Sequence, residues 1–291
     1  MSNKKLSVSV IIPAYNEENR IAECLEAICN QSIKPLEILL IDNNSNDQTV
    51  VIANKFSDIT IIRERDQGLS YARSTGFNSA KGDIIARIDA DTVVPYDWLE
   101  KLQLQFMQYN DLDGVTGYGY SNIGRYSDIL SRAWSWFYFT HCKAFFGCTV
   151  LWGANMAIRS SVWSQVKDLC VYDDSLIHED IDLSLALNSI GAHLKVVPDM
   201  IACVDFSGMM YFEKFWAYNV KKHNNRQIHS HHFRSRLATN IYYPRYHRLL
   251  FHVLSTYTIA LHMLFAVCNS MVRSMTTFYY QRIRISFTDI E

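Results

Sequence analysis

Short apolar runs, each followed by polar residues, recur through the N-terminal part of the chain and constrain the fold more than any other feature. They are rich in β-branched residues, which is typical of buried parallel strands, and they span residues 6–12, 36–41, 59–63 and 84–88. Asn16-Glu17-Glu18-Asn19 is expected to open a helix with apolar positions at 21, 24, 25 and 28, and a second helix is expected over residues 69–80. This alternation predicts an α/β sheet.

Polar clusters follow three of these runs at their carboxyl ends, where open α/β sheets bind ligands. The clusters are Pro13-Ala14-Tyr15-Asn16-Glu17, the loop that begins at Asp42, and Asp89-Ala90-Asp91. Two carboxylates one residue apart repel each other, and a shared Mg²⁺ or Mn²⁺ that also binds substrate phosphates would relieve the repulsion. An ordinary acidic loop is the alternative for a D-x-D triplet. The chain has no G-x-G-x-x-G after the first run and no P-loop lysine, which argues against dinucleotide and P-loop sites.

The composition is that of a globular protein and argues against disorder over most of the chain. Of 291 residues, 49% are hydrophobic and 20% are charged, enough for one large core or two small ones. The seven cysteines are scattered without a C-x-x-C pair or metal spacing, which favours a reduced cytosolic location. The start of the chain leads directly into a strand pattern, so we expect no signal peptide. We expect no nucleic-acid partner.

The charge is distributed unevenly around a net value of −1. From Met209 to the end there are eleven Lys and Arg but three Asp and Glu, and seven of the ten histidines also lie there. We therefore expect a catalytic domain over residues 1–208, a basic, aromatic and amphipathic segment over 209–248, and a hydrophobic helical tail over 249–291. A basic tail beside an acidic body indicates an anionic surface or anionic substrates.

The apolar stretch from Leu249 to Val272 has no Asp, Glu, Lys or Arg and is long enough to span a bilayer. Its histidines, Ser255, Thr256 and Asn269 form a polar stripe, so a helix lying in the membrane interface or packed on the body is the alternative. Basic residues flank both ends and fix no orientation.

Six motifs in order carry a resemblance to a known family. They are Val10 to Glu17, the Asp42 loop, Gln67-Gly68-Leu69-Ser70-Tyr71-Ala72-Arg73, Asp89-Ala90-Asp91, Gly153-Ala154-Asn155-Met156-Ala157-Ile158-Arg159 and His178-Glu179-Asp180-Ile181-Asp182-Leu183. This series resembles the family 2 glycosyltransferases over about the first two thirds of the chain. The resemblance implies a GT-A fold with a Rossmann-like sheet that binds a nucleotide diphosphate sugar, and a reaction that inverts the anomeric centre.

The resemblance also implies roles for the donor and cation residues. Asp42 would read the base of the nucleotide, while Pro13, Tyr15 and Glu17 would wall its pocket. Arg73 would help to hold the donor, Asp89 would sit near the ribose, and Asp91 would ligate a cation that bridges the two phosphates. The alternatives are a helix-capping role for Asp42 and a solvated helix position for Arg73.

The general base is expected in the acidic pair Glu179-Asp180, with Asp180 as the first choice and Glu179 in reserve. The same residues with Asp182 also fit the acidic first turn of a helix, and both interpretations can hold together.

The sequence departs from the family pattern at two positions. Ala186 stands where many members have an Arg after the acidic motif, and Asp205 stands near the position of a cation-binding His, so Asp205 is a second candidate metal ligand. A Q-x-x-R-W motif of processive members is absent, which favours a single transfer per encounter. The aromatic segment from Tyr126 to Trp152 fits either an acceptor-lining surface or a core helix.

Together these features predict a metal-dependent glycosyltransferase that acts on a lipid-linked or saccharide acceptor at the cytoplasmic face of the cell membrane, in the biosynthesis of envelope polysaccharide or glycolipid. A nucleotidyltransferase of similar fold is one alternative, although the N-terminal loop lacks a basic phosphate grip. A non-catalytic sugar-nucleotide or membrane-binding module is the other. Fold alone does not decide between them.

Overall fold

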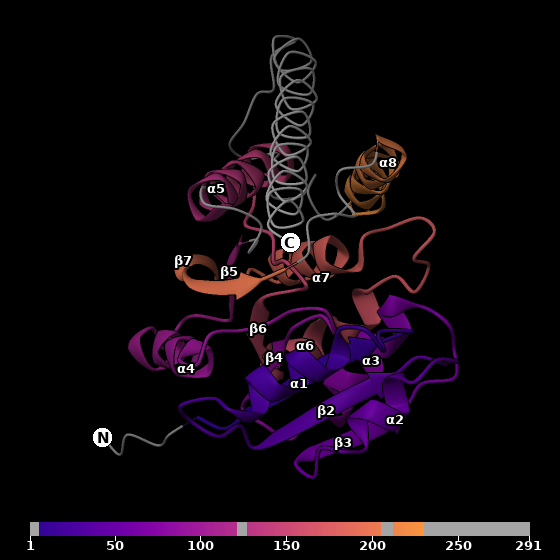
Figure 1. The fold of residues 1–291 in the computed structure, drawn as a ribbon. Coiled ribbons are helices and arrows are strands. Elements are labelled where there is room, and N and C mark those ends of the chain that lie inside the picture. Colours follow the sequence, from indigo (N-terminus) through magenta and orange to yellow (C-terminus); the bar gives the residue numbers. More distant parts are fainter. Residues whose placement is uncertain (1–5, 121–126, 205–211, 230–291) are drawn as a thin grey trace, which may run out of the picture. The chain divides into compact units, whose positions relative to one another are not determined.

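The computed structural model describes residues 6–120, 127–204 and 212–229. Seven strands form one sheet in the order β3-β2-β1-β4-β6-β5-β7 (Figure 1). The strands are β1 (Val8–Ala14), β2 (Glu37–Asp42), β3 (Ile59–Arg63), β4 (Ile84–Arg87), β5 (Gly114–Tyr120), β6 (Met156–Arg159) and β7 (Leu194–Cys203). The helices are α1 (Ile21–Cys29), α2 (Thr49–Ala53), α3 (Leu69–Ser79), α4 (Trp98–Gln108), α5 (Ser127–Phe146), α6 (Ser160–Val166), α7 (Glu179–Ser189) and α8 (Phe212–Ile228), with a 3-10 turn at Lys167–Leu169.

The four strands expected from the sequence are all present and run parallel to one another. β1 lies between β2 and β4, and β3 pairs with the outer edge of β2. β6 is antiparallel to both β4 and β5, so the sheet is mixed. Because β1, β2 and β4 are parallel neighbours, the polar residues that follow them lie at one edge of the sheet.

The first helix begins later than the sequence predicted. α1 starts at Ile21, whereas Asn16-Glu17-Glu18-Asn19 forms a turn. Asn16 has a φ of 56°, outside the helical region, and the Glu17 carbonyl accepts the Ile21 N–H at 2.9 Å. The polar residues of this motif are therefore presented from a loop.

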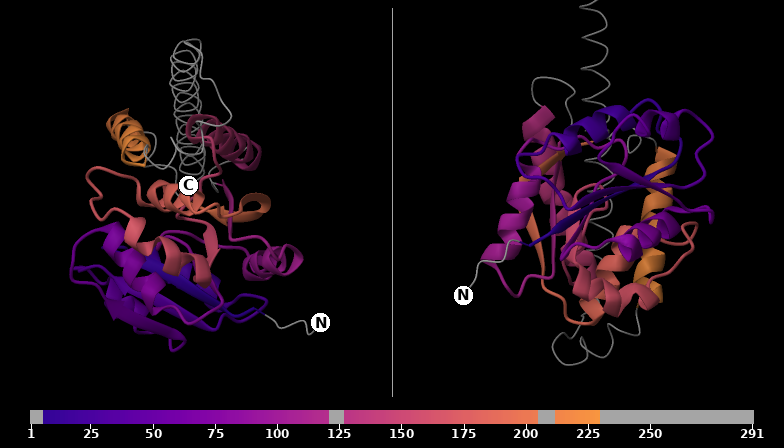
Figure 2. Two further views of the ribbon diagram at one scale, coloured as in Figure 1. Left: turned by 180° about the vertical axis from the view of Figure 1, so that it is seen from behind. Right: turned by 90° about the horizontal axis from the view of Figure 1, so that it is seen from below.

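Side chains of the central strands alternate between two apolar cores on opposite faces of the sheet. Helices lie on both of these faces (Figure 2). On β2, Ile38 and Leu40 pack into the core that contains α1 and α4, while Leu39 and Ile41 pack into the core that contains α3, α6 and α7. This alternation explains why the strands read as continuous apolar runs, since both faces are covered by helices.

A third apolar core lies between α5 and α7. It bears on whether the aromatic segment from Tyr126 to Trp152 is a core helix or an acceptor-lining surface. Phe139, Cys142 and Phe146 are buried at helical spacing and pack near Ile181. The core-helix interpretation is therefore confirmed for this stripe of α5. Trp136, by contrast, is 60% exposed.

The described residues up to Val204 and those of α8 from Trp216 onward belong to one compact unit. Part of the predicted segment 209–248 thus belongs to the same compact unit as the sheet. Among the described residues, the structure contains no helix that is both long and apolar enough to cross a bilayer. The stretch 249–272 and Asp205 lie outside the described residues.

Candidate functional site

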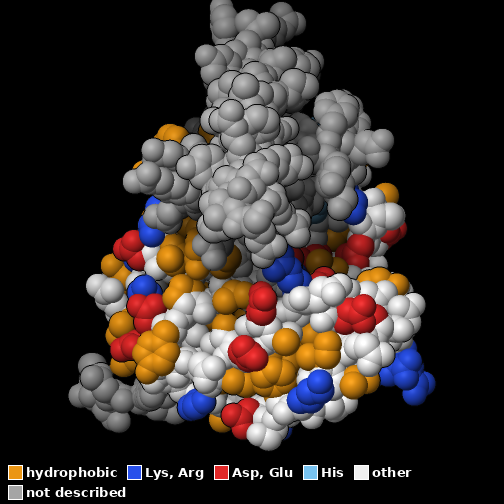
Figure 3. Space-filling view, viewed as in Figure 1, with side chains coloured by type: hydrophobic (Ala, Val, Ile, Leu, Met, Phe, Trp, Pro, Cys, Tyr) orange, Lys and Arg blue, Asp and Glu red, His pale blue; other side chains and the backbone are white. Residues whose placement is uncertain are grey.

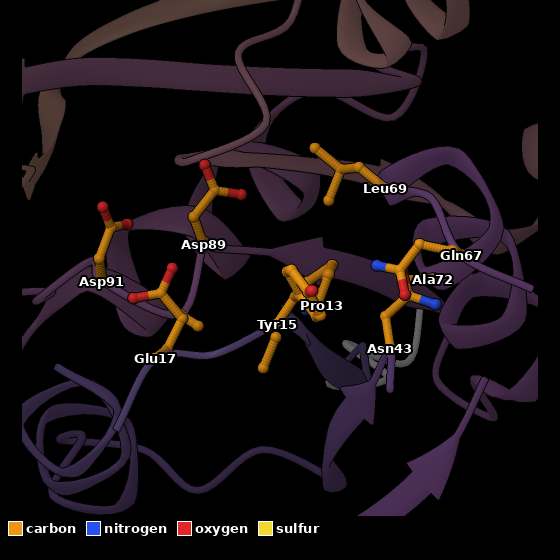
Figure 4. Close-up of a pocket in the computed structure, with 11 residues that line it drawn as sticks. Pro13, Tyr15, Glu17, Asn43, Gln67, Leu69, Ala72, Asp89 and Asp91 are labelled. Carbon is orange, nitrogen blue, oxygen red and sulfur yellow. The ribbon is translucent and has the colours of Figure 1, made fainter. Parts of the chain in front are cut away.

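A pocket of about 360 Å³ lies at the carboxyl ends of β1, β2 and β4 (Figure 4). This volume is within the range of small-molecule sites. The lining residues come from four of the predicted motifs, one of which runs from the loop before α3 into that helix: Pro13, Ala14, Tyr15, Glu17, Asn43, Gln67, Leu69, Ala72, Asp89, Ala90 and Asp91. The predicted convergence of these motifs is therefore observed. The surface seen in Figure 3 carries acidic and apolar side chains side by side.

One end of the pocket is acidic. Figure 4 shows the carboxylates of Glu17, Asp89 and Asp91 gathered on one side of Pro13. Burial, followed by the negative charges of Asp91 and Asp89, raises the pKa of Glu17 to about 7. Three carboxylates gathered at one end of the pocket offer oxygen ligands to a cation.

The other end of the pocket carries amides. Asn43 is buried, donates to the Asp66 carbonyl at 2.7 Å and accepts the Gly68 N–H at 2.8 Å, so it fastens the loop before α3 to the end of β2. Gln67 lies beside it in Figure 4. Sequence reasoning missed Asn43 as a site residue, although its place directly after a strand is a usable signal.

Asp42 is buried at the end of β2 but is not among the residues that line the pocket. Its carboxylate accepts the Ser45 N–H at 3.0 Å and stabilises the turn after β2. Helix α2 begins only at Thr49, so this bond is not a helix cap. Asn43, the first residue after β2, lines the pocket in place of Asp42.

Two buried arginines share one glutamate behind the pocket. Arg87 Nη1 donates to Glu179 Oε1 at 2.6 Å, and its Nη2 donates to Asp89 Oδ1 at 2.9 Å. Arg73 Nη1 donates to the Glu179 carbonyl at 2.6 Å and lies 3.4 Å from Oε2. Arg73 is thus fully buried and directed toward α7 instead of lining the pocket. Each Glu179 carboxylate oxygen is occupied by an arginine.

Arg87 was not proposed from the sequence, yet it links the two halves of the site. It is 1% exposed and connects Asp89, at the pocket, to Glu179, at the start of α7. Gly153 leaves room for it, since a Cβ at that position would lie 2.7 Å from Arg87 Nη2. No periodicity or local motif signals this pairing, because 92 positions separate Arg87 from Glu179.

Asp180 lies next to this network in the first turn of α7. Its carboxylate accepts the N–H groups of Gly153, at 3.2 Å, and of Ile181, at 2.7 Å. Burial, followed by the negative charge of Glu179, raises the pKa of Asp180 to about 7, against the opposing effects of the Gly153 N–H and of Arg87. A carboxylate with a pKa near neutrality suits proton abstraction. The Glu179 carboxylate, in contrast, is ion-paired with Arg73 and Arg87.

Among the residues that the structure describes, no cluster of three or more His, Cys, Asp and Glu has the arrangement of a metal site made by the protein alone. Ala186 is fully buried in the core that contains α3 and α6, so this position faces away from solvent.

Solved structures share this fold. A mannosyltransferase from Pyrobaculum calidifontis, in complex with GDP-Man and Mn²⁺, aligns with a TM-score of 0.58 at 18% identity over 94% of this chain and 86% of that one. Residues 1–349 of S. aureus TarS, in complex with UDP-GlcNAc, align with a TM-score of 0.54 at 16% identity over 81% and 74% of the two chains. The described sheet therefore has the GT-A glycosyltransferase architecture.

Sequence comparison narrows this class to a family. The model of glycosyl transferase family 2 matches residues 9–166, and the chain belongs to that family. A probable glycosyltransferase from Bacillus subtilis, YdaM, is 30% identical over 210 residues, which cover 67% of this chain and 49% of YdaM. Glycosyltransferase GlyA from Streptococcus pneumoniae is 34% identical over 106 residues, or 35% of this chain and 15% of GlyA. The chain thus matches about half or less of the length of these relatives.

Proposed function

We propose that this protein is an inverting, metal-dependent glycosyltransferase that transfers a sugar from a nucleotide diphosphate sugar to a lipid-linked or saccharide acceptor. The observation that carries the proposal is that a cluster of carboxylates at the pocket, which could bind a cation, is linked by a hydrogen-bond network to a separate carboxylate that could act as a base. Glu17, Asp89 and Asp91 crowd one end of the pocket, while Asp180 stands apart at the start of α7, connected to Asp89 through Arg87 and Glu179. The relatives and the two solved structures, with GDP-Man and with UDP-GlcNAc, support the donor class.

The acidic end of the pocket fits a divalent cation. Its donors are hard carboxylate oxygens, and after burial the charges of Asp91 and Asp89 contribute to the raised pKa of Glu17. Mg²⁺ and Mn²⁺ commonly bind through one or two carboxylates together with substrate phosphates, which agrees with a pocket that has no complete protein cage among the described residues. Asp91, supported by Asp89, would hold the ion, and the ion would neutralise the departing diphosphate.

The nucleotide would occupy the rest of the pocket. Pro13 and Tyr15 offer apolar and aromatic walls, and Asn43 and Gln67 offer amide groups to polar atoms of a base or ribose. Asp42 and Arg73 would act indirectly, Asp42 by shaping the turn at Ser45 and Arg73 by holding Glu179.

Asp180 would remove the proton from the acceptor hydroxyl. Its two backbone N–H partners orient the carboxylate, and its raised pKa lets it exchange a proton near pH 7. Glu179 would keep the neighbouring arginines in place.

We further propose that the protein works at the cytoplasmic face of the cell membrane, in building envelope polysaccharide or glycolipid. The support is the excess of Lys and Arg after Met209 and the apolar stretch 249–272. Basic residues near an anionic leaflet contribute about 1 kcal/mol each, and buried apolar area adds to this.

The test is a panel of UDP- and GDP-sugars incubated with the full-length protein and Mg²⁺ or Mn²⁺, with and without lipid acceptors. We expect one donor to release its nucleoside diphosphate and to transfer its sugar. Asp91→Asn should abolish transfer, Asp180→Asn should lower it by about 100-fold and leave a measurable residual rate, and Asp58→Asn, on an exposed loop, should leave it unchanged. Release of pyrophosphate instead would indicate a nucleotidyltransferase, and donor binding without turnover would indicate a binding module.

A further inference from the structure

Helix α8 is fastened to the residue that precedes α7. Asn225 of α8 is fully buried, and its side-chain oxygen accepts the His178 N–H at 2.9 Å. Its side-chain nitrogen donates to the His178 carbonyl at 3.1 Å. The amide therefore satisfies both backbone groups of the residue that caps α7, two positions before Asp180.

A second buried contact follows Asp180. His229, just after α8, lies with Nε2 2.8 Å from Asp182 Oδ1, and both side chains are buried. The other oxygen of Asp182 accepts the Val171 N–H at 2.9 Å. Asn225 and His229 thus hold α7 on both sides of Asp180 in sequence.

The same helix is anchored to α5. The Lys222 ammonium group lies 5.3 Å from the ring centre of Phe145 and 5.8 Å from that of Phe146. The Arg226 guanidinium lies 4.9 Å from the ring centre of Phe145. These cation–π contacts brace α8 while Asn225 and His229 contact α7.

We propose that Asn225 and His229 are positioning residues that fix the orientation of Asp180; this inference rests on the proposed role of Asp180 as the base. Neither residue lines the donor pocket, so each acts through the first turn of α7. The terminal turn of a helix frays when it lacks tertiary partners, and a displacement of about 1 Å from the productive geometry can reduce a rate about 100-fold. Helix α8 therefore helps to hold Asp180 in place, although it lies after the family's motifs in the sequence.

The experiment measures donor affinity and turnover separately in full-length variants. Asn225→Ala and His229→Phe remove the contacts, the second while keeping an aromatic ring of similar size. We expect kcat for transfer to fall by about 10- to 100-fold, with the Kd of UDP or GDP in the presence of Mn²⁺ unchanged. His229→Gln, whose amide can still donate to Asp182, should restore most of the turnover.

The matched control is Gln227→Ala, on the same helix, because Gln227 contacts the exposed His223. This control should leave both measurements at wild-type values. Each variant is also placed in an Asp180→Asn background, where positioning of the base has no further effect, so no additional loss of turnover is expected. Thermal unfolding identifies any variant that is not folded, and the comparison of His229→Phe with His229→Gln then carries the test.

Wild-type turnover in folded Asn225→Ala and His229→Phe would overturn the inference, as would parallel losses of nucleotide affinity and turnover. Further loss in the Asp180→Asn background would also overturn it, because the effect would not pass through the base. Full activity of Asp180→Asn itself would refute the proposed base, an outcome that is separate from failure of the α8 contacts alone.

Discussion

Replacing Asp180 by Asn should stabilise the protein while it lowers transfer by about 100-fold. The native pKa of Asp180 is about 7, against an ordinary value of 3.8. Between these two values the native state keeps a proton that the unfolded state has lost, so wild-type stability falls as pH rises from about 4 to 7. Above pH 7 the carboxylate is ionised in both states, and the folded protein bears the full penalty of its burial.

The size of the effect follows from the rise of the pKa from 3.8 to about 7, which corresponds to roughly 4 kcal/mol because a tenfold change in the proton-binding equilibrium is worth about 1.4 kcal/mol. Asn offers one acceptor oxygen, whereas Asp180 accepts two backbone N–H groups, from Gly153 and Ile181. Loss of one such bond costs about 1 to 2 kcal/mol. The net stabilisation at pH 8 should therefore be about 2 to 3 kcal/mol, and as the pH falls toward 4 it should give way to a small destabilisation, because only the lost hydrogen bond then remains.

The assay is urea unfolding of the full-length protein, followed by tryptophan fluorescence at pH 8 and at several lower values. Asp58→Asn is the control, because it makes the same chemical change at an exposed loop position and should leave the stability of the protein as in the wild type. An Asp180→Asn variant that is less stable than the wild type at pH 8 would refute the reasoning, since it would mean that the native fold favours the ionised carboxylate. A gain in stability with lost turnover is the pattern expected when a catalytic group is held in an unfavourable environment.

Three further predictions concern the cation, the arginine network and the membrane. Asp91→Asn should remove the additional thermal stabilisation that Mn²⁺ gives in the presence of nucleotide, which in the wild type reaches about 2.7 kcal/mol at 100 times the dissociation constant; an unchanged Mn²⁺ effect would exclude Asp91 as the ligand. Gly153→Ala should destabilise the fold by about 1 to 3 kcal/mol in urea unfolding, since its Cβ would lie 2.7 Å from Arg87 Nη2, and equal stability would show that the guanidinium can move freely. Full-length protein should sediment with vesicles that contain anionic lipid and be released by high salt, whereas protein that stays in the supernatant at low salt would contradict the membrane assignment.

The sequence by itself determined the central sheet and the general place of the site. Buried strands have a local signature, because residues that face two apolar cores must nearly all be apolar, as Leu39 and Leu40 illustrate. Parallel neighbours then bring the loops after them together, which is why Glu17, Asp89 and Asp91 could be assigned to one pocket before any coordinates were considered. The acidic first turn of α7 was readable for the same reason, since its charge pattern is local.

Tertiary structure alone decided how the individual side chains are used. Asp42 and Asn43 are adjacent and both polar. Asp42 nevertheless binds the Ser45 N–H in a turn, whereas Asn43 lines the pocket. Arg73 looked like a donor-binding residue but is buried against Glu179, 106 positions away. Asn225 reaches the backbone of His178 across 47 positions. Such pairings depend on which elements pack together in space, and local propensity and periodicity carry no information about partners so far apart in the chain.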